Sequence, residues 1–128
     1  MTPYEFRQFL EDPQILPADT IVMFSFDPSK GNDPYDDTDL YFVSAIADWN
    51  GFELKITPVG CGTIQDLIDE MDVVDVDEMS VILNGQSYVL ADSCYFGYAE
   101  SIGYHYVLFS QEEADPDLAG DGEVLHVL

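Results

Sequence analysis

The chain is 128 residues long and 47% hydrophobic, so it fits one folded domain with a buried core rather than a disordered acidic segment. Its 26 Asp and Glu residues face only three Lys and Arg, and the net charge is -23. Binding phosphate groups requires cationic side chains, so this balance argues against a direct nucleic-acid ligand and against adhesion to an anionic membrane.

The first half of the chain predicts a helix followed by three strands. The segment Thr2–Glu5 begins with a capping threonine, has a proline at the first helical position and completes a capping box with its glutamate. Apolar residues follow at helical spacing until Pro13, and a turn is expected at residues 16–19. Residues 27–39, rich in Pro, Gly, Asn and Asp, predict an exposed loop. Strands are expected at residues 20–26, 40–49 and 52–59.

The second half repeats this order of elements. A second cap at Thr63 precedes one apolar helical stripe, which consists of Ile64, Leu67, Ile68 and Met71. An acidic turn at 72–78 follows, and Asn84-Gly85 is typical of a tight hairpin turn. Strands are expected at residues 79–83, 87–91, 95–101 and 104–110.

Two pairs of segments suggest a diverged tandem repeat of one helix and three strands. Tyr41-Phe42-x-x-Ala45 matches Tyr95-Phe96-x-x-Ala99, and the pattern of residues 51–56 parallels that of 103–108. We therefore expect an α+β fold with an antiparallel sheet in one domain, residues 1–110, with repeat halves at about 2–59 and 63–110. Residues 111–128 form an acidic tail, whose first part we expect to be mobile and whose last five residues have the pattern of a short strand.

Catalytic signals are absent from the sequence. Among 26 carboxylates some pair lies close by chance, so composition cannot identify an acid/base dyad. His105 and His126 fit ordinary surface or edge positions, and no nucleophile motif or phosphate-binding glycine loop is present. Cys61 and Cys94 have no paired spacing and are expected to be free thiols of a reducing cytoplasm. We expect neither an enzyme nor a cofactor.

Metal binding is the next alternative, because five Asp residues lie within 27–39 and oxygen ligands suit calcium or magnesium. Their spacing lacks the glycine and terminal glutamate of the twelve-residue calcium loop. We therefore expect a solvated loop rather than a metal site. The N-terminus has no basic region followed by an apolar one, and no run approaches roughly 18 apolar residues, so we expect a cytoplasmic protein without a membrane span.

The second helix and the turn after it carry the clearest acidic pattern. Seven of the thirteen residues from 66 to 78 are acidic and none is cationic. Surfaces that only need to be soluble usually intersperse Lys among the acids, so this pattern favours contact with a basic partner. The expected partner-binding surface consists of Asp66, Asp69, Glu70, Asp72, Asp75, Asp77 and Glu78, with Asp33, Asp36, Asp37 and Asp39 of the loop and Glu112 and Glu113 of the tail.

A compact domain of this length is roughly 36 Å across, and duplex DNA carries about 21 phosphate charges over that distance. The net charge of -23 is of the same order. With its small size, excess of Asp over Glu, scarce Lys and Arg and aromatic residues, the chain resembles the DNA-mimic inhibitors of phages and mobile elements, which include anti-CRISPR and anti-restriction proteins. The resemblance covers the whole chain as composition and involves no shared motif. It implies a protein that binds the basic nucleic-acid-binding surface of a CRISPR effector or restriction enzyme and blocks DNA binding.

Two other functions stay open on the same composition. A halophilic cytoplasmic protein also has many Asp and few Lys, although such surfaces usually accompany weaker cores than this one. An immunity or antitoxin protein that neutralises a basic nuclease has the same electrostatics and differs only in its partner. Edge strands and the number of aromatic residues are compatible with a homodimer.

Overall fold

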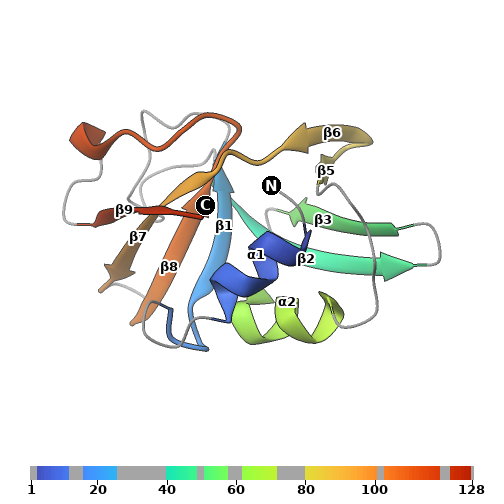
Figure 1. Cartoon of the computed structure of the whole chain (residues 1–128), viewed down its shortest axis with the longest axis horizontal. Helices are drawn as coiled ribbons and strands as arrows, with labels where there is room; N and C mark the ends of the chain where they lie inside the picture. The colour runs from blue at the N-terminus through green and yellow to red at the C-terminus, as the bar shows by residue number, and fades with distance from the viewer. Residues whose placement is uncertain are drawn as a thin grey trace.

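The computed structural model describes eight segments of the chain, which are residues 3–11, 16–25, 40–48, 51–57, 62–71, 80–100, 103–118 and 122–127 (Figure 1). In chain order the described elements are α1 (Pro3–Leu10), β1 (Ile21–Ser25), β2 (Leu40–Asp48), β3 (Gly51–Thr57), β4 (Gly62–Thr63), α2 (Ile64–Met71), β5 (Ser80–Leu83), β6 (Gln86–Val89), β7 (Ser93–Ala99), β8 (Tyr104–Phe109), the 3-10 helix η2 (Pro116–Leu118) and β9 (Glu123–His126). The predicted helices and strands therefore recur, and β4 is an addition that the sequence pattern did not indicate.

The strands form one mixed sheet in the order β6-β5-β3-β2-β1-β8-β7-β9, and β4 also pairs with β1. Two neighbouring pairs are parallel: β1 with β8, where Val22 faces Val107, and β3 with β5, where Leu54 faces Val81. The α+β class is confirmed, but the sheet is not wholly antiparallel. Parallel neighbours need a long crossover, which is usually helical. Because α2 lies between β3 and β5, it forms part of the crossover that joins these two parallel strands. It is therefore not the first element of a second copy of residues 2–59.

The tandem repeat is not confirmed. The segments compared as repeats each form a hairpin, β2 with β3 and β7 with β8, and the two hairpins flank the central strand β1. In the first hairpin the leading strand β2 lies antiparallel to β1, whereas in the second the trailing strand β8 lies parallel to it. The registers differ as well, because Ala45 pairs with Leu54 and the proposed equivalent Ala99 pairs with Tyr104.

Both helices pack on one face of the sheet, as Figure 1 shows. Phe6 and Phe9 of α1 direct their rings at Phe109 of β8, with centroid separations of 5.1 and 6.4 Å. Ile64 and Leu67 of α2 belong to the same buried cluster, together with Val22 and Phe24 of β1 and several neighbouring residues. Burying these apolar side chains is the main source of stability on this face.

A second, smaller cluster lies on the opposite face of the sheet. All five residues of β1 are buried, and since successive strand residues point to opposite faces, Ile21 and Met23 face away from the helices. They pack with Tyr95, Tyr106 and Leu108. A central strand that is covered on both faces explains the continuous apolar run of β1.

The C-terminal segment covers part of this second face. Ala114 and Val124 pack against the cluster around Met23, and the backbone nitrogen of Asp115 donates a 2.9 Å hydrogen bond to the hydroxyl of Tyr95. Residues 111–118 are thus held against β7, in contrast to the expected mobile tail, because a half-buried alanine and several hydrogen bonds anchor the acidic stretch. The expected terminal strand is present as β9, which pairs antiparallel with β7, Leu125 facing Cys94.

Candidate protein-binding surface

The N-terminus of α2 is held by a reciprocal pair of hydrogen bonds. The backbone nitrogen of Asp66 donates to Oγ1 of Thr63 at 3.3 Å, and the backbone nitrogen of Thr63 donates to Oδ2 of Asp66 at 3.2 Å. This is the predicted cap, with an aspartate in the acceptor position of a capping box. Asp66 is exposed, as expected for a partner contact, but its carboxylate also stabilises the helix start.

Acidic residues continue along α2 into its last turn. Asp69 is exposed and accepts a 2.9 Å hydrogen bond from Nε2 of Gln65. Glu70 follows Asp69 in the helix, and the last turn contains no basic residue. Anions near a helix C-terminus oppose the helix dipole and destabilise the helix by roughly 0.3–1 kcal/mol each. Asp69 and Glu70 therefore lie in the turn of the helix where an anion is least favourable.

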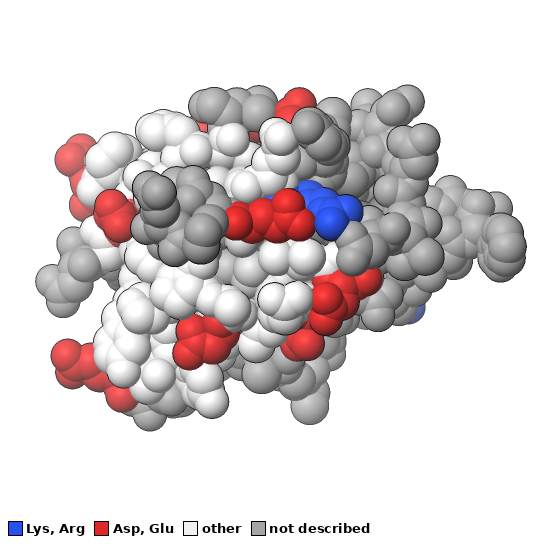
Figure 2. All heavy atoms as spheres, turned by 60° about the horizontal axis from the view of Figure 1, so that its bottom comes forward, with Lys and Arg blue, Asp and Glu red and all other residues white. Residues whose placement is uncertain are grey.

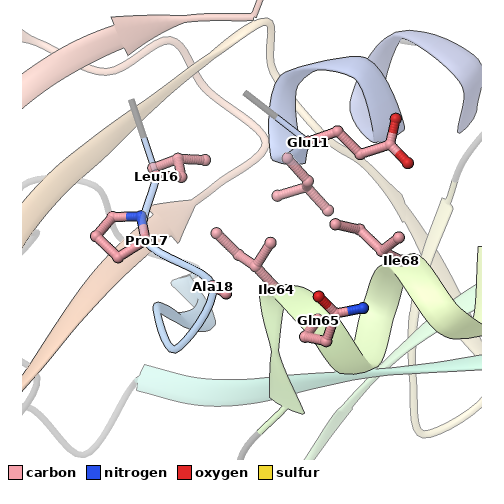
Figure 3. A pocket seen from close by; sticks show the side chains of 8 residues that line it. Glu11, Leu16, Pro17, Ala18, Ile64, Gln65 and Ile68 are labelled. Atoms are coloured by element: carbon pink, nitrogen blue, oxygen red, sulfur yellow. The ribbon is translucent and has the colours of Figure 1, made fainter. Parts of the chain in front are cut away.

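A groove of mixed polar and apolar lining lies between α1, the turn before β1 and α2, with a volume of about 360 Å³ (Figure 3). Its apolar lining side chains converge from the three elements, as Figure 3 shows. The lining residues are Leu10, Glu11, Leu16, Pro17, Ala18, Ile64, Gln65 and Ile68. Leu10, Leu16 and Ile64 are buried beneath it, whereas Pro17, Ala18 and Gln65 are exposed beside it. The groove is therefore an open surface of mixed polar and apolar character, with its apolar floor largely buried.

Cations offset few of the charges around this groove. Nε of Arg7 lies 2.9 Å from Oε1 of Glu11, one turn further along α1, so this pair is neutral. No salt bridge joins Asp19, Asp66 or Asp69 to a described cation, Arg7 or Lys55. Figure 2 shows carboxylates distributed over the face turned up from the bottom of Figure 1, with uncharged surface between them. The helix face thus carries a groove of mixed lining and exposed carboxylates that no described salt bridge neutralises.

The structure does not bring all of the predicted acidic residues together. Asp66 and Asp69 lie on the helix face, whereas Glu112 and Glu113 belong to the segment that covers the opposite face. Oε2 of Glu113 also accepts a 2.6 Å hydrogen bond from the hydroxyl of Ser93. Of Glu70 only the backbone is described. The following residues lie outside the described part of the chain: Asp33, Asp36, Asp37, Asp39, Asp72, Asp75, Asp77 and Glu78.

Sequence reasoning missed two features that the fold assembles. The groove is one, and its signal was the apolar start of a turn, Leu16-Pro17-Ala18, where turns are usually polar. The other is an aromatic cluster on β7 and β8. The ring of His105 stacks on Phe96 with centroids 5.6 Å apart, and the ring of Tyr98 lies edge-on to His105 with centroids 5.0 Å apart. Tyr98 is 54% exposed. Each residue alone looked like an ordinary strand residue.

Potential metal-binding side chains do not cluster in the described segments. These segments contain no group of three or more His, Cys, Asp and Glu side chains that could hold a metal ion. The acidic loop at 27–39 lies outside them. Burial raises the pKa of the Cys94 thiol far above its usual range, so this thiol stays protonated and unreactive in the core.

Comparisons with known proteins do not assign the chain to a class. No family model matches it, and no curated protein or solved structure matches it either. Neither α1 nor α2, the two α-helices of the described segments, combines the length and apolar character that crossing a lipid bilayer requires.

Proposed function

We propose that this protein is an acidic inhibitor that binds the basic nucleic-acid-binding surface of a defence enzyme, a CRISPR effector or a restriction enzyme, in the cytoplasm of the host cell. By occupying that surface it blocks DNA binding. The observation that carries the proposal is the charge of -23 on a folded scaffold. Within the described segments, eleven exposed carboxylates accompany two cations, Arg7 and Lys55.

The physical basis is electrostatic competition. A negative field of this size steers the protein toward Lys- and Arg-rich surfaces and raises the rate of encounter. The same cations hold DNA by neutralising phosphates, so the two ligands exclude one another. The described carboxylates lie on both faces of the sheet, so they support competition through the field of the whole molecule rather than a phosphate-by-phosphate copy of one strand.

A competition assay tests the proposal. The immobilised protein is incubated with host lysate at about 50 mM salt, bound proteins are eluted in a salt gradient, and each captured enzyme is assayed for binding to its DNA with and without the inhibitor. We expect elution well below about 500 mM salt and displacement of DNA in proportion to inhibitor. Capture that is indifferent to salt over this range, or a partner that binds DNA and inhibitor together, would exclude the mechanism.

A further inference from the structure

The strand β6 forms one end of the described sheet, and Figure 1 shows the β5–β6 hairpin at the upper right, far from β9 at the left. The turn residues Asn84 and Gly85 have φ angles of 52° and 81°, and two positive values identify a type I′ turn. Such a turn is closed by a hydrogen-bonded pair, here Leu83 with Gln86. Hydrogen-bonded pairs then alternate with non-hydrogen-bonded pairs along the hairpin.

This alternation determines where the backbone groups of β6 point. Val81 and Tyr88 form the next hydrogen-bonded pair, whereas Ser87 and Val89 occupy non-hydrogen-bonded positions. The N–H and C=O groups of Ser87 and Val89 therefore point away from β5, toward the outer edge of the sheet. Within the described segments, no turn or loop hydrogen bond reaches the backbone of either residue. The outer edge of β6 thus presents donors and acceptors in the alternating pattern that another strand can pair with.

The edge of β6 also lacks the features that usually keep sheet edges from pairing, which are charged side chains, prolines and bulges. Residues 79–91 contain no charged residue, and this is the longest uncharged stretch of the chain. The strand contains no proline, and its register with β5 is continuous. Val89 is 66% exposed at this edge. The strand at the other end of the sheet, β9, has the exposed charge of Glu123.

We propose that β6 pairs antiparallel with β6 of a second copy of this chain, about a two-fold axis, so that the two sheets become continuous. In this register Tyr88 faces its own copy, and Ser87 of each chain faces Val89 of the other. These are the two residues with outward backbone groups, so each Ser87–Val89 pair exchanges two hydrogen bonds and no outward group is left unpaired. The contact is self-complementary, as a two-fold interface requires.

The distribution of charge identifies a second copy as the occupant. Two bodies that each have a net charge of -23 repel one another, and the repulsion is smallest where their closest parts are uncharged. The strand β6 meets this condition, and β5 behind it is uncharged as well. An edge without carboxylates offers a basic partner no local attraction. The pairing also places the two Tyr88 rings side by side on one face, where cross-strand aromatic pairs are favourable, and covers Val89 on the other.

The two-fold axis of an antiparallel strand pair is perpendicular to the sheet. Both copies therefore keep their helices on the same side, and the exposed Asp66 and Asp69 of each α2 add to one side of the continuous sheet. The inference stands apart from the proposed function, because it needs only the edge of β6.

Sedimentation equilibrium of the full chain, from about 10 μM to about 1 mM, tests the pairing at two salt concentrations. We expect a monomer–dimer equilibrium that is severalfold stronger at about 500 mM salt than at about 50 mM, because screening weakens the repulsion between the copies. Capture of a basic partner has the opposite salt dependence. Amide hydrogen exchange of Ser87 and Val89 should slow as the concentration rises, whereas that of Tyr88, which is already paired with Val81, should not change.

Two variants block the edge in different ways. Val89→Pro removes an outward donor without removing a hydrogen bond to β5, and Ser87→Glu places like charges on both strands. Gln65→Glu adds the same charge at an exposed position of α2 and is the matched control. We expect each β6 variant to weaken dimerisation by about tenfold or more, since the two-fold axis repeats every change, and the control to weaken it far less.

A chain that stays monomeric at both salt concentrations would overturn the inference. A dimer that is unaffected by both β6 variants, or one whose formation leaves the exchange of Ser87 and Val89 unchanged, would also overturn it. Each of these results would leave the electrostatic inhibition of a DNA-binding enzyme standing, because that function is tested on binding to the enzyme rather than on self-association.

Discussion

The hydroxyl of Ser93 in β7 donates a 2.6 Å hydrogen bond to Oε2 of Glu113, twenty residues further along the chain. The hydroxyl oxygen of Ser93 also accepts a 2.8 Å hydrogen bond from the backbone nitrogen of Ala114. Ser93 is almost fully buried, so one side chain satisfies a backbone donor and a carboxylate that cover the second face of the sheet. These contacts explain why the acidic segment after β8 packs on the sheet rather than extending from it.

Replacing this serine should loosen the C-terminal segment. Ser93→Ala leaves the nitrogen of Ala114 and the carboxylate of Glu113 without their described partner, and we expect a loss of about 1–3 kcal/mol in the free energy of unfolding. Amide hydrogen exchange should speed up in residues 111–118. Ser87→Ala, at an exposed position of β6, is the control and should change neither quantity. Unchanged exchange in Ser93→Ala would show that the segment is held by other contacts.

The hydroxyl of Thr20 should oppose folding. Its Oγ1 is buried without a hydrogen-bond partner among the described residues, although its backbone bonds are made with Pro17 and Ile64. Thr20→Val keeps the shape and removes the unpaired polar atom, so we expect a gain of about 1 kcal/mol and a rise in melting temperature of roughly 3–6 °C. Thr63→Val makes the same chemical change at the cap of α2, where Oγ1 accepts a hydrogen bond, and should lower stability by about 1 kcal/mol. Shifts of the same sign would contradict this assignment.

The local elements could be predicted because their signals are local. The cap at Thr63, the alternation of β3 and the turn at Asn84-Gly85, whose φ angles are 52° and 81°, depend on residues adjacent in sequence. The parallel pairing of β3 with β5 depends instead on where the chain returns after α2. That choice is made by burial of Leu54 and Val81 in one core, which a single sequence does not encode at any one position.

The candidate site could be predicted only in part for the same reason. Its charges are visible in the sequence, and Asp66 and Asp69 are exposed on α2 as expected. The groove needs Leu10, Leu16 and Ile64 from three separate elements, and periodicity assigns all of them simply to the core. The separation of the α2 acids from Glu113 likewise follows from the contact between Glu113 and Ser93, which lie twenty residues apart in the sequence.

Salt dependence of folding separates the inhibitor from the halophilic alternative. Mutual repulsion at a net charge of -23 should lower stability, and screening should restore it. Because the sheet is buried on both faces by two apolar clusters, we expect a folded protein at about 50 mM salt, with a melting temperature that rises by several degrees toward 500 mM. Thermal denaturation monitored by circular dichroism measures this. A chain that folds only in molar potassium chloride would support the halophilic function instead.

The charge of Asp69 should have opposite effects on folding stability and on binding to a basic partner. It lies near the C-terminal end of α2, where an anion is unfavourable, so Asp69→Asn should raise the free energy of unfolding by a few tenths of a kcal/mol, and the amide oxygen can still accept from Gln65. The same change should weaken binding to a basic peptide severalfold, because the charge lies beside the groove.

Glu53→Gln is the matched control, since it also removes one exposed charge. Glu53 lies on β3 and points away from the helix face, because its neighbour Leu54 points toward that face. It should reduce binding only through the total charge, and therefore by less than Asp69→Asn. Denaturant unfolding and peptide titration on both variants measure the two effects. If the two substitutions weaken binding equally, the field of the whole molecule is sufficient and the helix face has no special part in recognition.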